Sequence, residues 1–269
     1  LHLLCSSLIF YRFRNKAKIT GAYDVWNVDY IYLNDSRRQI DTVRKDLAFV
    51  YEPTPLLKDY YAMPVWHFKT DPSVYMADTV RITVRNNFIN ELNLFNKIVI
   101  SDTTNPTTPY YVFPGLNQFL PISDFSGITL PYPINFSYPT TAIDTSQVFK
   151  ARCDVDFRPA TIEIKDFIRA NDTVYSNAVL KDYYAYDDGS AEAGYGVNAG
   201  TFGGNETFMA VEFSSPFPDT IGGVMMYYLP QDFDARKQKV ELRVWNSLRP
   251  TNLLFKKEMT LNPIYGKQG

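Results

Sequence analysis

The feature that most constrains the fold is a series of short segments in which apolar and polar residues alternate. The clearest of them is Ala77–Asn86. There Val80, Ile82 and Val84 fall on one side, while threonines and arginines fall on the other. A period of two is the pattern of a half-buried β-strand, because successive side chains of a strand point to opposite faces. The segment therefore predicts a strand with one face in a hydrophobic core.

Segments of the same kind recur along the whole chain, separated by turns rich in Pro, Thr, Asn and Gly. Strands are expected at Leu8–Arg14, Asp24–Asn34, Lys97–Ser101, Tyr110–Phe113, Val148–Phe157, Thr161–Phe167, Thr173–Leu180, Phe208–Phe213, Thr220–Leu229, Lys239–Trp245 and Leu253–Leu261. Leu47–Tyr51 is a short apolar run. Leu116–Pro139 is expected to be a long loop or irregular edge structure, and Leu56–Ala62 one or two helical turns. The aromatic share of 16% also favours strands. The sequence predicts an all-β protein.

The spacing of the strands and turns predicts tandem β-sandwich modules. We expect the C-terminal part of a truncated sandwich over residues 1–45 and an immunoglobulin- or fibronectin-like sandwich over 46–181. The N-terminal part of a further jelly-roll-like sandwich is expected over 182–269. The first and last modules are too short to close a core, so the chain is expected to be a fragment of a longer polypeptide.

Charge and hydropathy exclude two classes of partner. The 27 Lys and Arg residues are scattered and outweighed by 29 Asp and Glu residues. Nucleic-acid binding requires a clustered basic face, so no nucleic-acid partner is expected. No apolar run approaches the roughly 20 residues that a transmembrane helix needs, so no transmembrane segment is expected.

Two cysteines and two histidines limit the chemistry available. The separation of Cys5 and Cys153 fits no metal-ligand spacing, and the histidines complete no local zinc motif. Either the cysteines are free, partly buried thiols, or they form a long-range disulfide in an oxidising compartment. His67 lies between Trp66 and Phe68 and is expected to be an ordinary, partly buried residue.

The stretch Asp182–Gly196 has the most unusual composition, with four tyrosines, four acids and three glycines. Two interpretations are open for its acidic part. Asp-Gly is a strong turn signal, so Asp187–Gly189 predicts a tight turn. Carboxylates around a glycine turn also suit Ca²⁺, with Asp187, Asp188 and Glu192 as candidate ligands. The spacing is not that of an EF-hand, and no other cofactor is expected.

Exposed aromatic side chains are candidates for stacking on sugar rings, although rings this numerous also belong in a core. The candidate ligand-binding residues are Trp26, Tyr30, Tyr184, Tyr186 and Tyr195, and Trp66 is a further exposed-aromatic candidate. Catalytic patterns are weak by comparison. Asp154 and Asp156 share a strand face, but acids on a strand face are usually solvated.

Two segments resemble large multidomain secreted proteins of Bacteroidota. They are Gly21–Leu33, with its Trp-Asn-Val-Asp-Tyr-Ile-Tyr-Leu run, and Tyr184–Gly196. Proteins of that kind carry such strands in lectin-like sandwiches, commonly followed by a sorting domain for the type IX secretion pathway. The resemblance implies a location outside the cell, either secreted or on the outer face of the outer membrane.

Together these features predict a non-catalytic, secreted or cell-surface binding or adhesion protein, with a polysaccharide or a surface protein as its ligand. One alternative is a subunit of an outer-membrane secretion or gliding assembly. Another is the accessory region of a secreted hydrolase whose catalytic domain lies outside these residues.

Overall fold

The computed structural model describes residues 14, 46–88, 90–103, 109–113, 115, 117–121, 127–138, 145–158, 171–189, 208–228, 235–248 and 251–264. The chain divides into two compact units. Unit 1 joins Leu1–Arg37 with Ile221–Gly269, and unit 2 is Arg38–Thr220. The described residues are mostly strand, which confirms the all-β prediction. Unit 2 reaches beyond residue 181, the predicted end of the middle module.

Unit 2 contains nine of the described strands and two short helices. In chain order they are β1 (Leu47–Phe49), β2 (Ala62–Pro64), α1 (Val65–Phe68), α2 (Pro72–Tyr75), β3 (Thr79–Asn86), β4 (Leu92–Asp102), β5 (Tyr111–Phe113), β6 (Asn117–Leu120), β7 (Ile128–Pro133), β8 (Gln147–Arg158) and β9 (Thr173–Lys181). Unit 1 contains β10 (Lys239–Leu248) and β11 (Thr251–Thr260).

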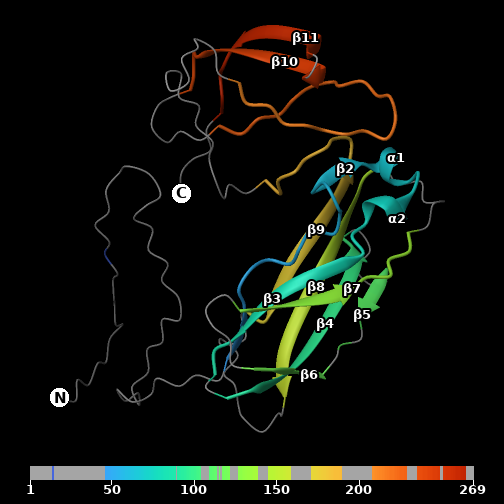
Figure 1. Ribbon diagram of the computed structural model, residues 1–269, viewed down its shortest axis with the longest axis vertical. Coiled ribbons are helices and arrows are strands. Elements are labelled where there is room, and N and C mark those ends of the chain that lie inside the picture. The colour runs from blue at the N-terminus through green and yellow to red at the C-terminus, as the bar shows by residue number, and fades with distance from the viewer. Residues whose placement is uncertain are drawn as a thin grey trace, which may run out of the picture. The chain divides into compact units, whose positions relative to one another are not determined.

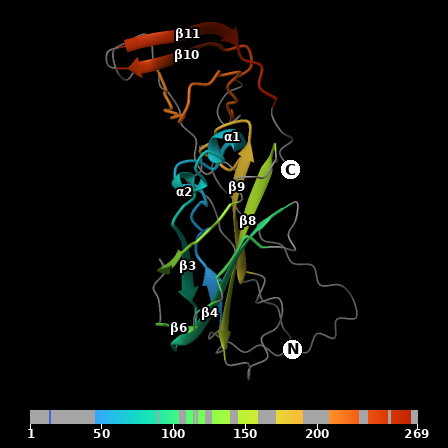
Figure 2. The ribbon, with the colours of Figure 1, turned by 90° about the vertical axis from the view of Figure 1, so that its right-hand side faces the viewer.

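The strands of unit 2 form two sheets that share one hydrophobic core. One sheet has the order β1-β3-β7, and the other has the order β2-β9-β8-β4-β5 with β6 also paired to β4. All pairs are antiparallel except β2 with β9. In Figure 1, β3 crosses in front of the long strands of the large sheet, and Figure 2 shows it to one side of β8 and β9. The predicted immunoglobulin- or fibronectin-like subclass stays a prediction.

The alternation in the sequence decides which side chains enter this core. Val80, Ile82 and Val84 of β3 are buried, as predicted. From the facing sheet, Phe149 of β8 is fully buried and contacts a cluster of aromatic rings. Phe113 of the large sheet packs edge-on against Tyr132 of the small one, with ring centroids 5.1 Å apart. Aromatic rings and aliphatic side chains together fill the space between the sheets, and burial of this apolar surface is the main favourable term in folding.

The strand β7 lies where a loop or irregular edge structure was expected. Its prolines hid the pattern, because proline cannot donate a hydrogen bond to a sheet ladder. Here β7 forms the edge of the small sheet, and Pro131 and Pro133 are exposed while Leu130 and Tyr132 are buried. An edge strand tolerates proline because one side of its backbone has no partner strand.

The helical turns lie later in the chain than the sequence predicted. Leu56–Ala62 contains no helix, so that expectation is wrong; the helices are α1 and α2. Helix α2 starts at Asp71, whose side chain accepts a hydrogen bond from the Ser73 backbone N–H at 3.2 Å. Pro72 follows at the first helical position, where its missing N–H costs nothing. Figures 1 and 2 place both helices at one end of the sheets.

Two predicted strands are absent from the described residues. Residues 208–228 contain no strand, so the predictions at Phe208–Phe213 and Thr220–Leu229 are wrong as far as the structure describes them. Both segments alternate as strands do, but a strand needs a hydrogen-bonded neighbour, and pattern alone does not supply one. Residues 208–220, called the wall segment below, are instead fixed to unit 2 by side chains.

Unit 1 is described chiefly as a β-hairpin. Strands β10 and β11 pair antiparallel, with irregular register near Trp245. One face is charged, with Glu241 paired to both Arg243 and Lys256. A two-stranded hairpin is marginally stable in water by itself, so most of its stability must come from packing with other parts of the chain or a partner.

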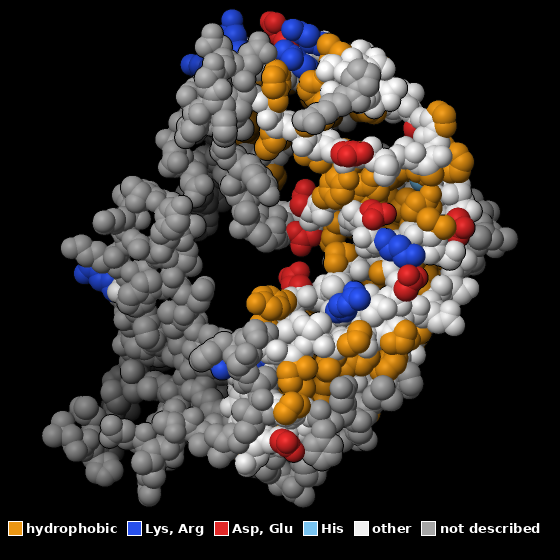
Figure 3. Space-filling view, in the orientation of Figure 1, with side chains coloured by type: hydrophobic (Ala, Val, Ile, Leu, Met, Phe, Trp, Pro, Cys, Tyr) orange, Lys and Arg blue, Asp and Glu red, His pale blue; other side chains and the backbone are white. Residues whose placement is uncertain are grey.

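The two helices of the described chain have four residues each, far short of what a membrane-crossing helix requires. The expected strands at Leu8–Arg14, Asp24–Asn34 and Thr161–Phe167 lie outside the described residues, apart from Arg14. In Figure 3, Lys and Arg side chains are interspersed with Asp and Glu side chains on the face shown.

Candidate functional site

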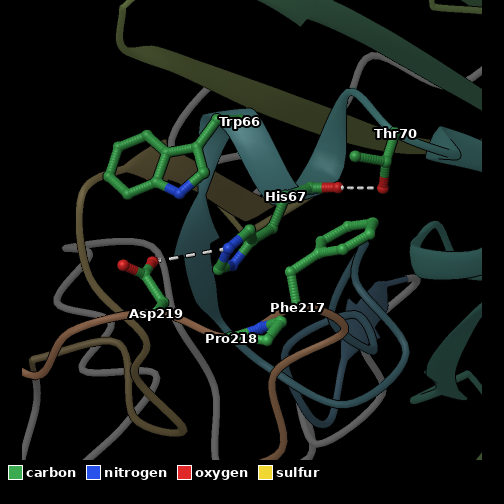
Figure 4. A pocket seen from close by; sticks show the side chains of 6 residues that line it. All are labelled: Trp66, His67, Thr70, Phe217, Pro218 and Asp219. Carbon is green, nitrogen blue, oxygen red and sulfur yellow. Dashed lines mark hydrogen bonds and ion pairs between the residues drawn. The ribbon is translucent and has the colours of Figure 1, made fainter.

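A shallow pocket of the described residues lies at α1, within unit 2. It has a volume of about 420 Å³ and is open to solvent. One wall is α1 and the residues after it, and the other is the wall segment. The lining residues are Trp66, His67, Thr70, Phe217, Pro218 and Asp219, and they define what is called the α1 pocket below. Figure 4 shows Trp66 and Asp219 on one side of His67 and Phe217 on the other.

The short helix separates exposed from buried side chains at this pocket. Trp66 is 48% exposed, whereas its neighbours Val65, His67 and Phe68 are buried. Phe68 is directed into the core, where it contacts Phe149. The core contact orients the helix so that the two preceding side chains, Trp66 and His67, face the pocket. The half-exposed tryptophan is thus carried by a helix that is packed on the core.

His67 connects the two walls of the pocket. Its Nδ1 lies 2.7 Å from the Tyr184 hydroxyl, and its Nε2 lies 3.4 Å from Asp219 Oδ2. Its carbonyl accepts a hydrogen bond of 2.6 Å from Thr70 Oγ1. A buried imidazole with both ring nitrogens engaged is well satisfied, so the expectation of an ordinary buried residue describes its packing.

The partners of His67 fix the positions of its protons. Asp219, when ionised, can only accept hydrogen bonds, so a hydrogen bond requires the proton on Nε2. Nδ1 of the neutral ring then accepts from Tyr184. Burial raises the pKa of the Tyr184 phenol, which keeps this donor protonated. Nδ1 of His67 is thus engaged by the Tyr184 hydroxyl, while Nε2 faces the Asp219 carboxylate across the pocket.

The wall segment is fastened by two tyrosines of unit 2. The Tyr60 hydroxyl donates to the Ser214 carbonyl at 3.0 Å and accepts from the Ser214 N–H at 2.8 Å. The Tyr186 hydroxyl donates to the Glu212 carbonyl. The Tyr60 ring also stacks on Phe213, with centroids 6.3 Å apart. The tyrosine hydroxyls therefore make hydrogen bonds with backbone groups of the wall segment that a neighbouring strand would otherwise make.

Two of the predicted ligand-binding residues lie beside this pocket without lining it. Tyr184 and Tyr186 each contact the Tyr60 ring, with centroid distances of 4.8 and 5.0 Å. Tyr184 supports His67, and Tyr186, which is half-exposed, supports the wall segment. The remaining predicted ligand-binding residues, Trp26, Tyr30 and Tyr195, lie outside the described residues.

The predicted calcium ligands are described in part. Asp187 Oδ1 accepts a hydrogen bond of 3.0 Å from the Gly189 N–H, and Gly189 has a φ of +93°. This is the geometry of the tight turn that Asp-Gly predicts. Asp188 is exposed, and Glu192 lies outside the described residues. Within the described chain, no three His, Cys, Asp or Glu side chains are grouped to hold a metal ion, so calcium binding stays a prediction.

The acids of β8 are engaged on the outer face of the large sheet. Asp154 accepts hydrogen bonds from Arg152 at 2.8 Å and from Thr173 at 2.7 Å. Directly before Asp154, Cys153 points into the core as a free thiol, and burial raises its pKa to about 12. Cys5 lies outside the described residues.

No protein-family model, curated protein or solved structure matches this chain. Trp66 was a candidate from its sequence, but His67, Phe217 and Asp219 were not ligand-binding candidates. His67 lies 150 or more positions before Phe217 and Asp219 in the chain, and no local motif joins them. Phe217 and Asp219 lie between two segments that were predicted to be strands, Phe208–Phe213 and Thr220–Leu229, so nothing local singled them out as ligand-binding residues.

Proposed function

We propose that this chain is a non-catalytic binding module of a secreted or cell-surface protein, and that its α1 pocket binds a polysaccharide. The observation that carries the proposal is the half-exposed Trp66 indole beside the Asp219 carboxylate. The location outside the cell is supported by the resemblance of two segments to secreted proteins of Bacteroidota.

A sugar ring has chemistry that suits this pocket. One face of a pyranose presents C–H groups, which pack against a flat aromatic ring such as that of Trp66. The rim carries hydroxyl groups, which donate to a carboxylate such as that of Asp219. Binding pockets generally combine aromatic walls with a few polar groups that fix orientation, and the α1 pocket has this composition.

The pocket favours binding over hydrolysis. Glycoside hydrolysis usually uses two carboxyl groups on opposite sides of the scissile bond, about 5 to 10 Å apart. The described lining of the α1 pocket supplies a single carboxyl group, that of Asp219. Both ring nitrogens of His67 have partners, so neither is free to act as a base for proton transfer in this arrangement.

The test is binding of the 269-residue chain to a glycan array, followed by titration calorimetry with the best oligosaccharide. Trp66→Ala should weaken binding about 5- to 150-fold, because loss of an aromatic stacking platform costs about 1–3 kcal/mol where nucleic-acid bases stack on such side chains. Tyr175→Ala is the matched control, since Tyr175 is 44% exposed but lies on β9 outside the pocket.

The controls decide the outcome. Both variants should melt at the wild-type temperature, because neither side chain belongs to the core. Absence of glycan binding by the wild-type chain, or equal binding by Trp66→Ala and wild type, would refute the proposal and favour a protein ligand.

A further inference from the structure

The charge of the α1 pocket narrows the kind of sugar it would hold. Asp219 is its one formally charged lining residue apart from His67, and no Lys or Arg lines it among the described residues. The Asp219 side chain is 45% exposed and stands at the pocket surface. Asp219 is therefore the acidic group that a ligand in this pocket would meet.

The hydrogen bonds of Asp219 leave part of this charge available to a ligand. Its Oδ1 accepts from the Thr220 N–H at 2.7 Å, and its Oδ2 faces His67 Nε2 at 3.4 Å. A carboxylate has about four acceptor positions on its two oxygens. Two are directed at the protein, and the contact to His67 is long. The group is held in place by these contacts but retains acceptor capacity toward the open side.

The aromatic walls add to the attraction for a cation. A positive group placed over an indole or phenyl face is attracted by the negative face of the ring, and tryptophan gives the strongest effect. Trp66 and Phe217 lie on either side of His67 in the pocket. A carboxylate on the same side of the pocket as the Trp66 indole suits a ligand that has an apolar body and one ammonium group.

We infer that the α1 pocket prefers amino sugars with a free, protonated amine over neutral or acidic sugars. This inference rests on the proposed function and specifies its ligand class. The ammonium group pairs with Asp219 while the sugar ring packs on Trp66. Sugars carrying carboxylate or sulfate groups are repelled by Asp219 and find no cation in the described lining.

The experiment compares three ligands of equal length by calorimetry, at a pH where the sugar amine is protonated. They are a glucosamine tetrasaccharide, its fully N-acetylated counterpart, and a galacturonic acid tetrasaccharide. Wild type should bind the first about two- to fivefold more tightly than the second, as a partly exposed ion pair gives. Binding of the third should be weakest.

Two variants separate the contribution of the Asp219 charge from that of the Trp66 stacking surface. Asp219→Asn should equalise the free-amine and acetylated ligands, while Trp66→Ala should weaken both. Glu52→Gln removes the same charge at an exposed position outside the pocket lining and should keep the wild-type preference. Thermal melting checks that each variant is folded, and Asp219→Glu, which keeps the charge, should retain the preference if Asn alters the wall.

The outcomes distinguish the two proposals. Equal wild-type affinity for the free-amine and acetylated ligands, or a preference that survives Asp219→Asn, overturns the amino-sugar inference and leaves polysaccharide binding intact. Binding of none of the sugars overturns both. The inference is also overturned if a tetralysine peptide binds as tightly as the glucosamine tetrasaccharide and Asp219→Asn abolishes that binding. The pocket would then recognise an amine without requiring a sugar ring.

Discussion

Replacing Tyr60 with Phe tests whether side chains, rather than a strand partner, hold the wall of the α1 pocket. The Tyr60 hydroxyl makes two hydrogen bonds with the backbone of Ser214 and is partly buried. The substitution keeps the ring and its stacking on Phe213 but removes both hydrogen bonds. Each such bond contributes about 0.5–1.5 kcal/mol net. The wall segment should therefore lose about 1–3 kcal/mol of local stability.

This loss of stability shifts the equilibrium between the closed and open wall segment, which hydrogen exchange can measure. A change of 1–3 kcal/mol is a factor of about 5 to 150 in an equilibrium constant. Hydrogen exchange followed by mass spectrometry should show faster exchange, by a factor in this range, in peptides that cover residues 208–220. Exchange in the core strands β4 and β8 should not change. Sugar affinity should fall as well, because a ligand must then select the closed population of the wall segment.

Two controls make the reasoning refutable. Ser214→Ala keeps both backbone bonds of Ser214 and loses only the 3.1 Å contact of its own hydroxyl with Tyr60, so its effect should be smaller. Tyr175→Phe removes an exposed hydroxyl elsewhere and should have none. If Tyr60→Phe leaves exchange of the wall segment at the wild-type rate, the segment is held by something other than these hydrogen bonds.

Three further predictions concern the core and the turns of unit 2. Phe149→Ala should lower the free energy of unfolding by about 3–5 kcal/mol in urea denaturation, because it leaves a cavity between the sheets; a loss below 1 kcal/mol would contradict this packing. Cys153 should resist thiol reagents at pH 8 until the chain is unfolded. Burial raises the pKa of the Cys153 thiol from 9.0 to about 12. Its contribution to the free energy of unfolding is therefore complete below pH 9 and is lost as the pH rises toward 12. Cys153→Ala should reduce this loss of stability at high pH. Gly127→Ala should destabilise more than Gly189→Ala in thermal melts: both have positive φ, but a Cβ at Gly127 would lie 2.8 Å from the Val84 carbonyl, whereas Gly189 has open space.

Alternation along the chain was enough to place most of the core. Val80, Ile82 and Val84 of β3 and the inward residues of β8 follow from a period of two, since a strand offers only two faces. The same rule overpredicted strands at Phe208–Phe213, because alternation states which side chains share a face but not whether another strand is adjacent.

The prolines of β7 show the opposite error. Pro131 and Pro133 are turn signals in a sequence, yet at a sheet edge they are compatible with a strand. Whether a strand lies at an edge or in the middle depends on the order of strands in the sheet. That order follows from contacts between residues far apart in the chain, such as Arg81 opposite Pro131.

The sequence by itself determined the all-β class, the buried face of the principal strands and the tight turn at Asp187. Each depends on residues within a few positions of one another, where backbone geometry and side-chain chemistry act locally. Tertiary structure alone decided the α1 pocket. It brings Trp66 and His67 together with Phe217 and Asp219, and this follows from how the wall segment is fastened to Tyr60, a contact between positions 154 residues apart.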